Sequence, residues 1–178
     1  MRTASLAIAA ILLAAVPARA QQKAHVTILE LAPRPEDVVT IDGIVAAFYE
    51  VVSGPAGQPR DWARDATLYL EPVTFTIIAV DSAGNPVART ISRQEFVDES
   101  NGFLVESGFT EREIHRETRR FGNLAHVWST YEWTIPDGRT GRGINGIDLF
   151  YDGTRWWITH ATWASEREDV PIPDEYLP

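Results

Sequence analysis

The sequence predicts an α+β protein in which helices come first and a curved antiparallel sheet follows, with the helices on one face of the sheet. Three observations support this prediction. Apolar residues recur at three- and four-residue spacing between Val38 and Val52, which is typical of an amphipathic helix. The segment from Val73 to Val80 is rich in β-branched residues. From Phe121 to Trp163, strand-like segments alternate with short turns, as in an antiparallel meander.

The first twenty residues have the three parts of a secretory signal peptide. Arg2 supplies positive charge, Ala7 to Val16 is an unbroken apolar run, and Ala18-Arg19-Ala20 is a small-residue cleavage site. The run is too short to span a membrane core of about 30 Å, which needs about 20 residues. We therefore expect residues 1–20 to be removed and the mature protein to be periplasmic or secreted, with no membrane attachment after cleavage.

The next part of the chain is predicted to be helical. Residues 21–35 form a flexible leader, and a domain of residues 36–165 follows. Glu36 and Asp37 place negative charge at the start of the first helix, where the helix dipole favours it. That helix is expected to end before Ser53-Gly54-Pro55, and a short second helix is expected from Arg60 to Arg64.

The middle of the chain is predicted to form a hairpin and a third helix. Ser92 and Glu95 fit a capping box, in which each side chain satisfies a free backbone amide of the other residue. The helix is expected to stop at Asn101-Gly102. The segments are, in order, strand from Asp65 to Glu71 and on through Val73 to Val80, turn from Asp81 to Pro86, strand from Val87 to Ile91, and helix from Arg93 to Ser100.

The chain then becomes strand-rich. Four strands are expected at about 110–121, 124–135, 142–151 and 155–164, separated by the turns Gly122-Asn123, Pro136-Asp137-Gly138 and Asp152-Gly153. Residues 166–178 form an acidic, proline-containing tail that we expect on the surface.

Composition excludes several classes of function. The chain has 16 basic and 25 acidic residues, and loss of Arg2 and Arg19 with the signal peptide leaves a net charge of −11, which repels nucleic acids and anionic lipid surfaces. Cysteine is absent, so there is neither a disulfide nor a thiol nucleophile. The four histidines lack metal-ligand spacing, and no phosphate-binding or nucleotide motif is present. We expect no metal and no cofactor.

The order of these segments resembles a known family. A long N-terminal helix followed by Asp65-Ala66-Thr67, a mid-chain helix and a closing strand with the pattern Asp-Gly-x-x-Trp-x-Ile, from Asp152 to Ile158, is similar to the nuclear transport factor 2-like superfamily. The likeness covers about Pro35 to Ser165. It is to the SnoaL-like group of cone-shaped folds, and within it to an exported bacterial branch of unassigned function. The resemblance implies a sheet that curls around the helices, with an apolar pocket on its concave face. The superfamily includes isomerases, dehydratases, cyclases and non-catalytic domains, so the fold does not choose a reaction.

Strand alternation then suggests which side chains face the pocket. On the last strand, the family's Trp-x-Ile spacing turns Trp156 and Ile158 inward, and alternation adds His160. Trp157 and Trp163 fall on the outer face. On the central strand, Ala125, Val127, Ser129, Tyr131 and Trp133 form a small and apolar inner set, and His126, Trp128, Thr130, Glu132 and Thr134 form the outer set. A single β-bulge would reverse such an assignment.

Candidate catalytic residues are His160, Tyr131, Glu71 and Asn145. A histidine near the pocket can act as acid or base near neutral pH, although a histidine hydrogen-bonded within the sheet is the plainer interpretation. Glu71 lies near the position of the carboxylate base of ketosteroid isomerases, but its spacing is one residue longer, which turns the side chain to the other face. The pocket-lining residues are predicted to be Phe48, Tyr49, Val127, Ser129, Trp156 and Ile158.

These observations predict an exported domain that binds a small apolar or amphipathic molecule. If it is an enzyme, cofactor-free acid–base chemistry such as isomerisation, dehydration or cyclisation is expected. The alternative is a non-catalytic module whose convex sheet face forms a homodimer or receives a protein partner.

Overall fold

The computed structural model describes residues 25–178, so the predicted signal peptide lies outside the described part. The helices are α1 (Pro35–Val38), α2 (Ile41–Glu50), α3 (Trp62–Ala66) and α4 (Arg93–Ser107), and a 3₁₀ turn covers Asp174–Tyr176. The strands are β1 (Tyr69–Val80), β2 (Pro86–Ser92), β3 (Thr110–Phe121), β4 (Leu124–Thr134), β5 (Thr140–Tyr151) and β6 (Trp156–Ser165). Within residues 25–178, no helix has the length and apolar character needed to cross a membrane.

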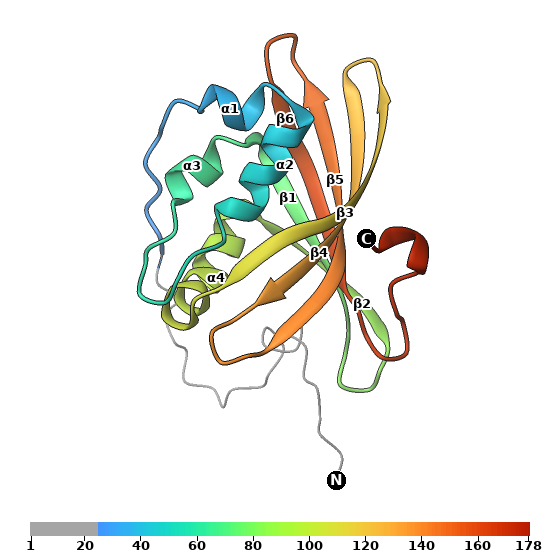
Figure 1. Cartoon of the computed structure of the whole chain (residues 1–178). Helices are drawn as coiled ribbons and strands as arrows, with labels where there is room; N and C mark the ends of the chain where they lie inside the picture. Colours follow the sequence, from blue (N-terminus) through green and yellow to red (C-terminus); the bar gives the residue numbers. More distant parts are fainter. Residues whose placement is uncertain (1–24) are drawn as a thin grey trace.

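All six strands form one sheet in the order β2-β1-β6-β5-β4-β3. Neighbouring strands are antiparallel except β1 and β6, which are parallel, and α4 and four strands lie between them in the chain. The four helices cover one face of the curved sheet, and the C-terminal turn lies on the other (Figure 1). The predicted α+β class and cone-like arrangement are confirmed, with a mixed sheet.

The expected first helix is divided into two. Thr40 has an extended backbone, and its hydroxyl accepts a hydrogen bond from the Gly43 amide at 2.9 Å, so it caps a new helix. Helix α1 therefore ends at Val38, and α2 carries the apolar face that packs on the sheet.

The predicted capping box of α4 is confirmed, but the helix is longer than expected. The Ser92 side chain accepts from the Glu95 amide, and the Glu95 carboxylate accepts from the Ser92 amide at 2.8 Å. Asn101 stays within the helix, where its side-chain oxygen accepts a hydrogen bond from the Trp62 indole at 2.7 Å. The helix ends at Ser107, and the capping residue Gly108 has a φ of +70°, which suits glycine.

The strand register shifts on β1 between Tyr69 and Thr74, on β3 and on β6, and such shifts change which side chains face the helices. On β6, Asp148 pairs with His160 and Leu149 pairs with Ile158, so Thr159 is an extra residue. On β3, the pairing shifts between Glu113 and His115. After the β6 bulge the inward side chains are Ala161, Trp163 and Ser165.

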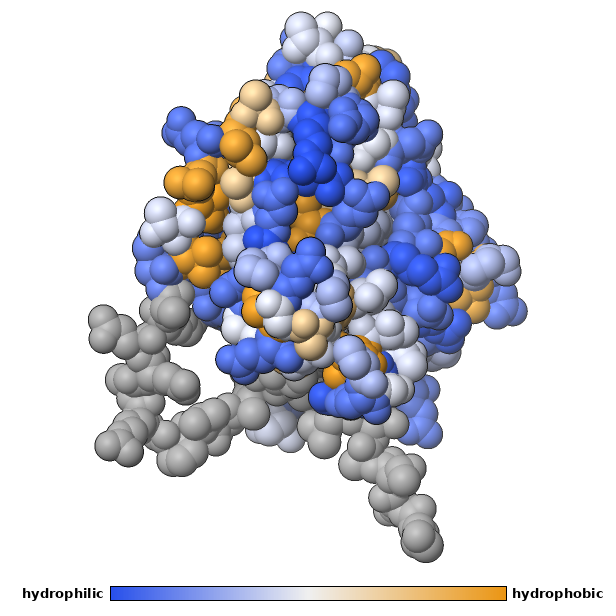
Figure 2. Space-filling model, turned by 60° about the vertical axis from the view of Figure 1, so that its left-hand side comes forward, coloured by the Kyte–Doolittle hydropathy of each residue, from blue (hydrophilic) through white to orange (hydrophobic). Residues whose placement is uncertain are grey.

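The core fills the space between the helices and the concave face of the sheet. Its fully buried side chains come from both layers, and the largest are Ile44, Leu68, Ile147, Leu149 and Ile158. A second cluster of Trp62, Val97 and Leu104 lies between α3 and α4. On the helix side, the surface is mostly hydrophilic with separate apolar patches (Figure 2).

Both described ends of the chain are attached to the domain. Near the start, the Val26 amide donates to the Asp98 carboxylate at 2.8 Å, and the Gln94 side chain donates to the Val26 carbonyl at 3.0 Å, so part of the leader is bonded to α4. At the other end, the Thr130 hydroxyl donates to the Tyr176 carbonyl at 2.8 Å on the convex face.

Candidate functional site

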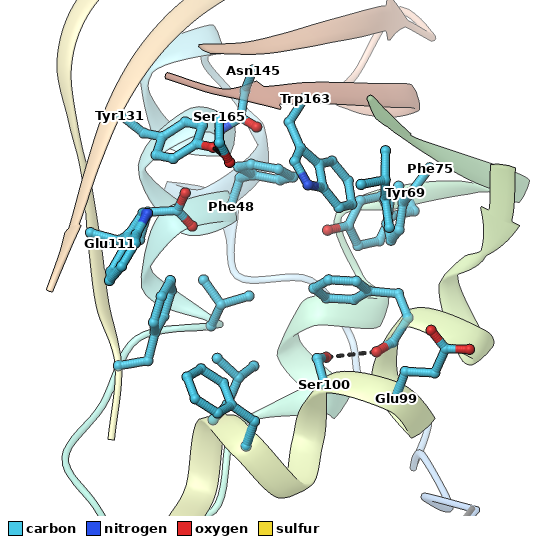
Figure 3. Close-up of a pocket in the computed structure, with 17 residues that line it drawn as sticks. Phe48, Tyr69, Phe75, Glu99, Ser100, Glu111, Tyr131, Asn145, Trp163 and Ser165 are labelled. Atoms are coloured by element: carbon cyan, nitrogen blue, oxygen red, sulfur yellow. Dashed lines mark hydrogen bonds between the residues drawn. The ribbon is translucent and has the colours of Figure 1, made fainter. Parts of the chain in front are cut away.

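A cavity of about 190 Å³ lies between α2 and α4 and the concave face of the sheet (Figure 3). Aromatic side chains make up most of its wall: Phe48, Tyr69, Phe75, Phe96, Phe103, Phe109, Tyr131, Trp133 and Trp163. The side chains that line the cavity follow the periodicity of the helix or strand that carries them. Alternate residues of β4 and β6 point inward, and the lining residues of α4 are spaced three and four apart, on one helix face.

Trp163 is placed in this wall by the β6 bulge. Its ring centroid lies 6.0 Å from that of Phe75 and 5.9 Å from that of Phe96, and Phe75 and Phe96 are 5.4 Å apart in an edge-to-face arrangement. These contacts join β1, β6 and α4 around one end of the cavity and fix the shape of its apolar wall.

Glu111 supplies a carboxyl group to the cavity. It lies near the start of β3, opposite Trp133, and its backbone amide donates to the Ser53 hydroxyl at 2.9 Å. Its carboxylate points into the cavity beside Tyr131 (Figure 3). The carboxyl group is surrounded by protein. The residue as a whole is only partly buried, because it forms part of the cavity wall.

The Glu111 carboxyl is held without a compensating charge. Among residues 25–178, no side chain donates a hydrogen bond to it or forms an ion pair with it. Burial alone therefore raises its pKa to about 8, since the charged form loses its hydration. A carboxyl group with this pKa can hold or release a proton near neutral pH.

Neutral polar groups lie beside this carboxyl. The Tyr131 hydroxyl is 3.5 Å from the Ser165 hydroxyl, and burial raises the Tyr131 pKa with a further contribution from nearby Glu111. Asn145 donates to the Tyr49 hydroxyl at 3.1 Å, and the Tyr49 hydroxyl is 2.7 Å from that of Ser129.

That network continues behind the cavity. Ser129 also donates to the Glu113 carboxylate, which forms an ion pair with Arg116 at 2.7 Å. Glu113 is therefore compensated, in contrast to Glu111.

A second buried carboxyl lies behind the wall and is also compensated. Asp65 accepts a hydrogen bond from the Tyr69 hydroxyl at 3.1 Å and forms an ion pair with Arg93 at 3.4 Å. Its complete burial outweighs these interactions and raises its pKa to about 6. This group orients Tyr69, which lines the cavity.

The structure brings three of the predicted site residues to the cavity: Tyr131, Asn145 and Phe48. Others predicted to line the pocket are buried in the surrounding core and do not line it: Tyr49, Val127, Ser129, Trp156 and Ile158. Tyr49 and Ser129 still contribute through the hydrogen bonds that hold Asn145.

His160 and Glu71 lie elsewhere. The Thr159 bulge turns His160 to the opposite face, where its ring nitrogen is 3.2 Å from the hydroxyl of exposed Thr74. The same bulge places Trp163 inside, where alternation had placed it outside. Glu71 is 56% exposed and forms an ion pair with Arg93 at 3.0 Å, in keeping with the extra residue in its spacing.

Sequence reasoning missed Glu111 as a site residue. The signal was its position two residues before Glu113, on a strand where strict alternation would place Arg112, Arg116 and Arg120 on the other face, but charged residues on such a strand are usually solvated. Phe103 and Leu104 lie beyond the expected end of the third helix, whereas the other α4 lining residues lie within its expected range and were not recognised as lining the pocket.

Among residues 25–178, no cluster of three or more potential metal ligands occurs. The site itself is an aromatic cavity with one uncompensated carboxyl group.

Comparison with known proteins finds likeness in structure only. No family model matches the chain, and no curated protein matches it. The similar solved structures include the benzoate 1,2-dioxygenase beta subunit of Burkholderia mallei, with 14% identity, a TM-score of 0.49, and coverage of 78% of this chain and 98% of that chain. A putative aromatic ring hydroxylase from Novosphingobium aromaticivorans has 15% identity, a TM-score of 0.49, and coverage of 76% and 92%.

A protein of unknown function from Shewanella baltica, described as NTF2-like, has 10% identity, a TM-score of 0.45, and coverage of 69% and 86%. The solved structures thus include members of the superfamily that the sequence resembles. At these identities and TM-scores the likeness concerns the arrangement of helices and strands, and no substrate or partner is carried over from it.

Proposed function

We propose that this protein is an exported domain that binds a small apolar or amphipathic molecule in the cavity between the helices and the sheet. The observation that carries the proposal is an aromatic-walled cavity of about 190 Å³ with one uncompensated carboxyl group. An apolar cavity of about 150 Å³ is enough to bind benzene. The proposed ligand is therefore the size of a molecule with one ring.

Export is part of this proposal and rests on residues 1–20. Their charged start, apolar run and small-residue cleavage site are those of a signal peptide. Determining the N-terminal residue of the protein recovered from outside the cytoplasm tests this: we expect Gln21, and an intact Met1 on protein retained in the cytoplasm would contradict it.

If the protein is an enzyme, the proposed chemistry is proton transfer without a cofactor. Glu111 replaces His160 as the proton carrier, because it faces the cavity and its pKa is raised to about 8. Tyr131 and Asn145 lie on the same wall and are suited to orienting a polar group of a substrate. This arrangement favours isomerisation, dehydration or cyclisation over hydrolysis by a covalent nucleophile.

Binding is tested with toluene and benzyl alcohol as probes, followed by calorimetry and by tryptophan fluorescence, to which Trp133 and Trp163 in the wall contribute. Ser100 lines the cavity from α4, so the Ser100→Phe variant should fill it and abolish binding. Ser82→Phe, in the exposed β1–β2 turn, is the matched control and should bind as the wild type does. Equal binding by both variants would place the probes elsewhere.

The convex face supports a second candidate function, homodimer formation. Phe121 is 87% exposed, Leu124 59% and Phe150 38%, and these residues are cross-strand neighbours on β3, β4 and β5. An exposed apolar row of this kind is common at protein interfaces. It is compatible with ligand binding because the cavity lies on the other side of the sheet.

A further inference from the structure

Among the described residues, the cavity lining contains acidic side chains but no basic ones. Its ionisable acidic groups are Glu99 and Glu111, and no lysine, arginine or histidine is among its lining residues within the described part of the chain. We infer that the ligand is a small hydrophobic amine, whose ammonium group pairs with the Glu111 carboxylate while the aromatic wall encloses its apolar body. This inference rests on the proposed ligand-binding function and narrows it to one chemical class.

The two acidic groups are not equivalent. Glu99 forms a bidentate ion pair with Arg89, at 2.6 and 2.7 Å, so its charge is already compensated by the protein. Glu111 has no such partner in the described residues. A buried carboxyl group without a counter-charge is costly for the protein, and a bound ammonium ion would supply that charge.

The wall is also suited to a cation. The faces of tryptophan, tyrosine and phenylalanine rings attract ammonium groups, most strongly where water is excluded. Tyr131 and Trp133 flank Glu111 on the neighbouring strand β4, so an ammonium ion at the carboxylate would meet aromatic rings as well. A carboxylate ligand would be repelled by Glu111 whenever that group is ionised, and no lining side chain among residues 25–178 would supply it with a positive counter-charge.

Binding would be linked to the release of a proton. The ionisable groups near Glu111 are Tyr49 from α2, Tyr131 from β4 and Glu113 on the same strand, and none of them supplies positive charge. In the empty cavity near pH 7 the Glu111 carboxyl keeps its proton. When an ammonium ion binds, that proton leaves to solvent and the carboxylate pairs with the cation.

The charge of the whole protein acts in the same direction. The complete chain carries a formal net charge of −9, and removal of the predicted signal peptide makes it more negative. Such a field raises the local concentration of cations and their rate of arrival, and it lowers both for anions.

The test compares three probes of the same shape: benzylamine, benzyl alcohol and benzoate. At pH 8 in low salt, we expect the wild type to bind benzylamine about tenfold more tightly than benzyl alcohol and benzoate most weakly. Glu111→Gln should remove the preference for benzylamine and leave benzyl alcohol binding within about twofold. Glu99→Gln is the matched control and should keep most of that preference.

Calorimetry at pH 7 in two buffers of different ionisation enthalpy gives an independent readout. The wild type should release a proton when it binds benzylamine, and the Glu111→Gln variant should release none.

The outcomes separate this inference from the proposed function. Binding of benzyl alcohol as tight as that of benzylamine, or an unchanged amine preference in Glu111→Gln, would overturn the amine inference and leave the cavity as a binding site for neutral molecules. Tightest binding of benzoate would overturn it as well. Failure of all three probes and of toluene to bind the wild type would contradict both proposals.

Discussion

At the scale of single residues, the contrast among three inward carboxyl groups identifies the one suited to function. Asp65 is paired with Arg93 and Tyr69, and Glu113 is paired with Arg116. Glu111 faces the cavity with no such partner in the described residues. A protein that retains such a group gives up stability there, which is common where a group is needed for binding or catalysis.

Glu111 should therefore make stability depend on pH. Its pKa rises from 4.5 to about 8 on folding, so the unfolded chain loses the proton first as the pH increases. The free energy of unfolding of the wild type should fall between about pH 4.5 and 8, by at most about 1.4 kcal/mol per pH unit from this group. Urea denaturation of wild type and Glu111→Gln should show a difference that grows across this window and is constant above it.

The buried Asp65 provides the internal control for that measurement. Its pKa rises to about 6, so it contributes a similar fall at lower pH in both proteins, and this contribution cancels in the difference. A difference between the two proteins that does not change with pH would mean that Glu111 titrates normally.

Tyr49 should act on stability through hydrogen bonds. Its hydroxyl contacts the Ser129 hydroxyl at 2.7 Å and the Asn145 side chain at 3.1 Å within the core. Tyr49→Phe should leave the Asn145 donor unsatisfied and lower the free energy of unfolding by about 1–3 kcal/mol. Tyr151→Phe, whose partly buried ring packs on Trp156, is the control and should change it by less than about 0.5 kcal/mol. Equal effects would show that the Tyr49 bonds contribute nothing specific.

Residue-scale prediction from the sequence was therefore partial. Tyr131, Asn145 and Phe48 line the cavity, because regular alternation and helix periodicity hold for the segments that carry them, and the roles expected of them stay predictions. His160 was misplaced because one inserted residue, Thr159, reverses the two faces of β6, and a bulge has no reliable sequence signal.

At the scale of elements, sequence signals were reliable where the hydrogen bonds join residues that are close in the sequence. The capping box at Ser92 and Glu95 forms as expected. Where a tertiary contact determines the end of a helix, the sequence was insufficient. Helix α4 continues past Asn101 because the Trp62 indole of α3 donates a hydrogen bond to the Asn101 side chain. The first helix is divided at Thr40, which caps α2. The regular spacing of apolar residues gave no sign of this division.

Helix α4 should depend measurably on its cap. Ser92→Ala removes the acceptor for the Glu95 amide and one partner of the Glu95 carboxylate, so we expect a loss of about 1 kcal/mol in the free energy of unfolding. Ser82→Ala in the exposed β1–β2 turn is the control and should change it by less than about 0.5 kcal/mol. A cap without energetic value would give the same result for both variants in thermal or urea denaturation.

At the scale of the whole molecule, the order of helices and strands was sufficient to predict the class of fold. The helices and the strand-rich second half pack as two layers because each has one apolar face to bury. The parallel pairing of β1 with β6 was not predicted, since strand order within a sheet depends on long-range packing that periodicity does not encode.

The convex face of the sheet is expected to mediate self-association. Phe121, Leu124 and Phe150 form an exposed apolar row at one end of the sheet, whereas the C-terminal segment is bonded to the same face at Thr130. We expect static light scattering of the protein without residues 1–20 to give a dimer at micromolar concentration. Leu124→Glu should shift it to monomer, because a carboxylate buried in an apolar interface costs several kcal/mol. Val39→Glu, which alters a residue 53% exposed beside the helices, should remain dimeric. A wild-type monomer, or equal behaviour of the two variants, would show that this row does not mediate self-association.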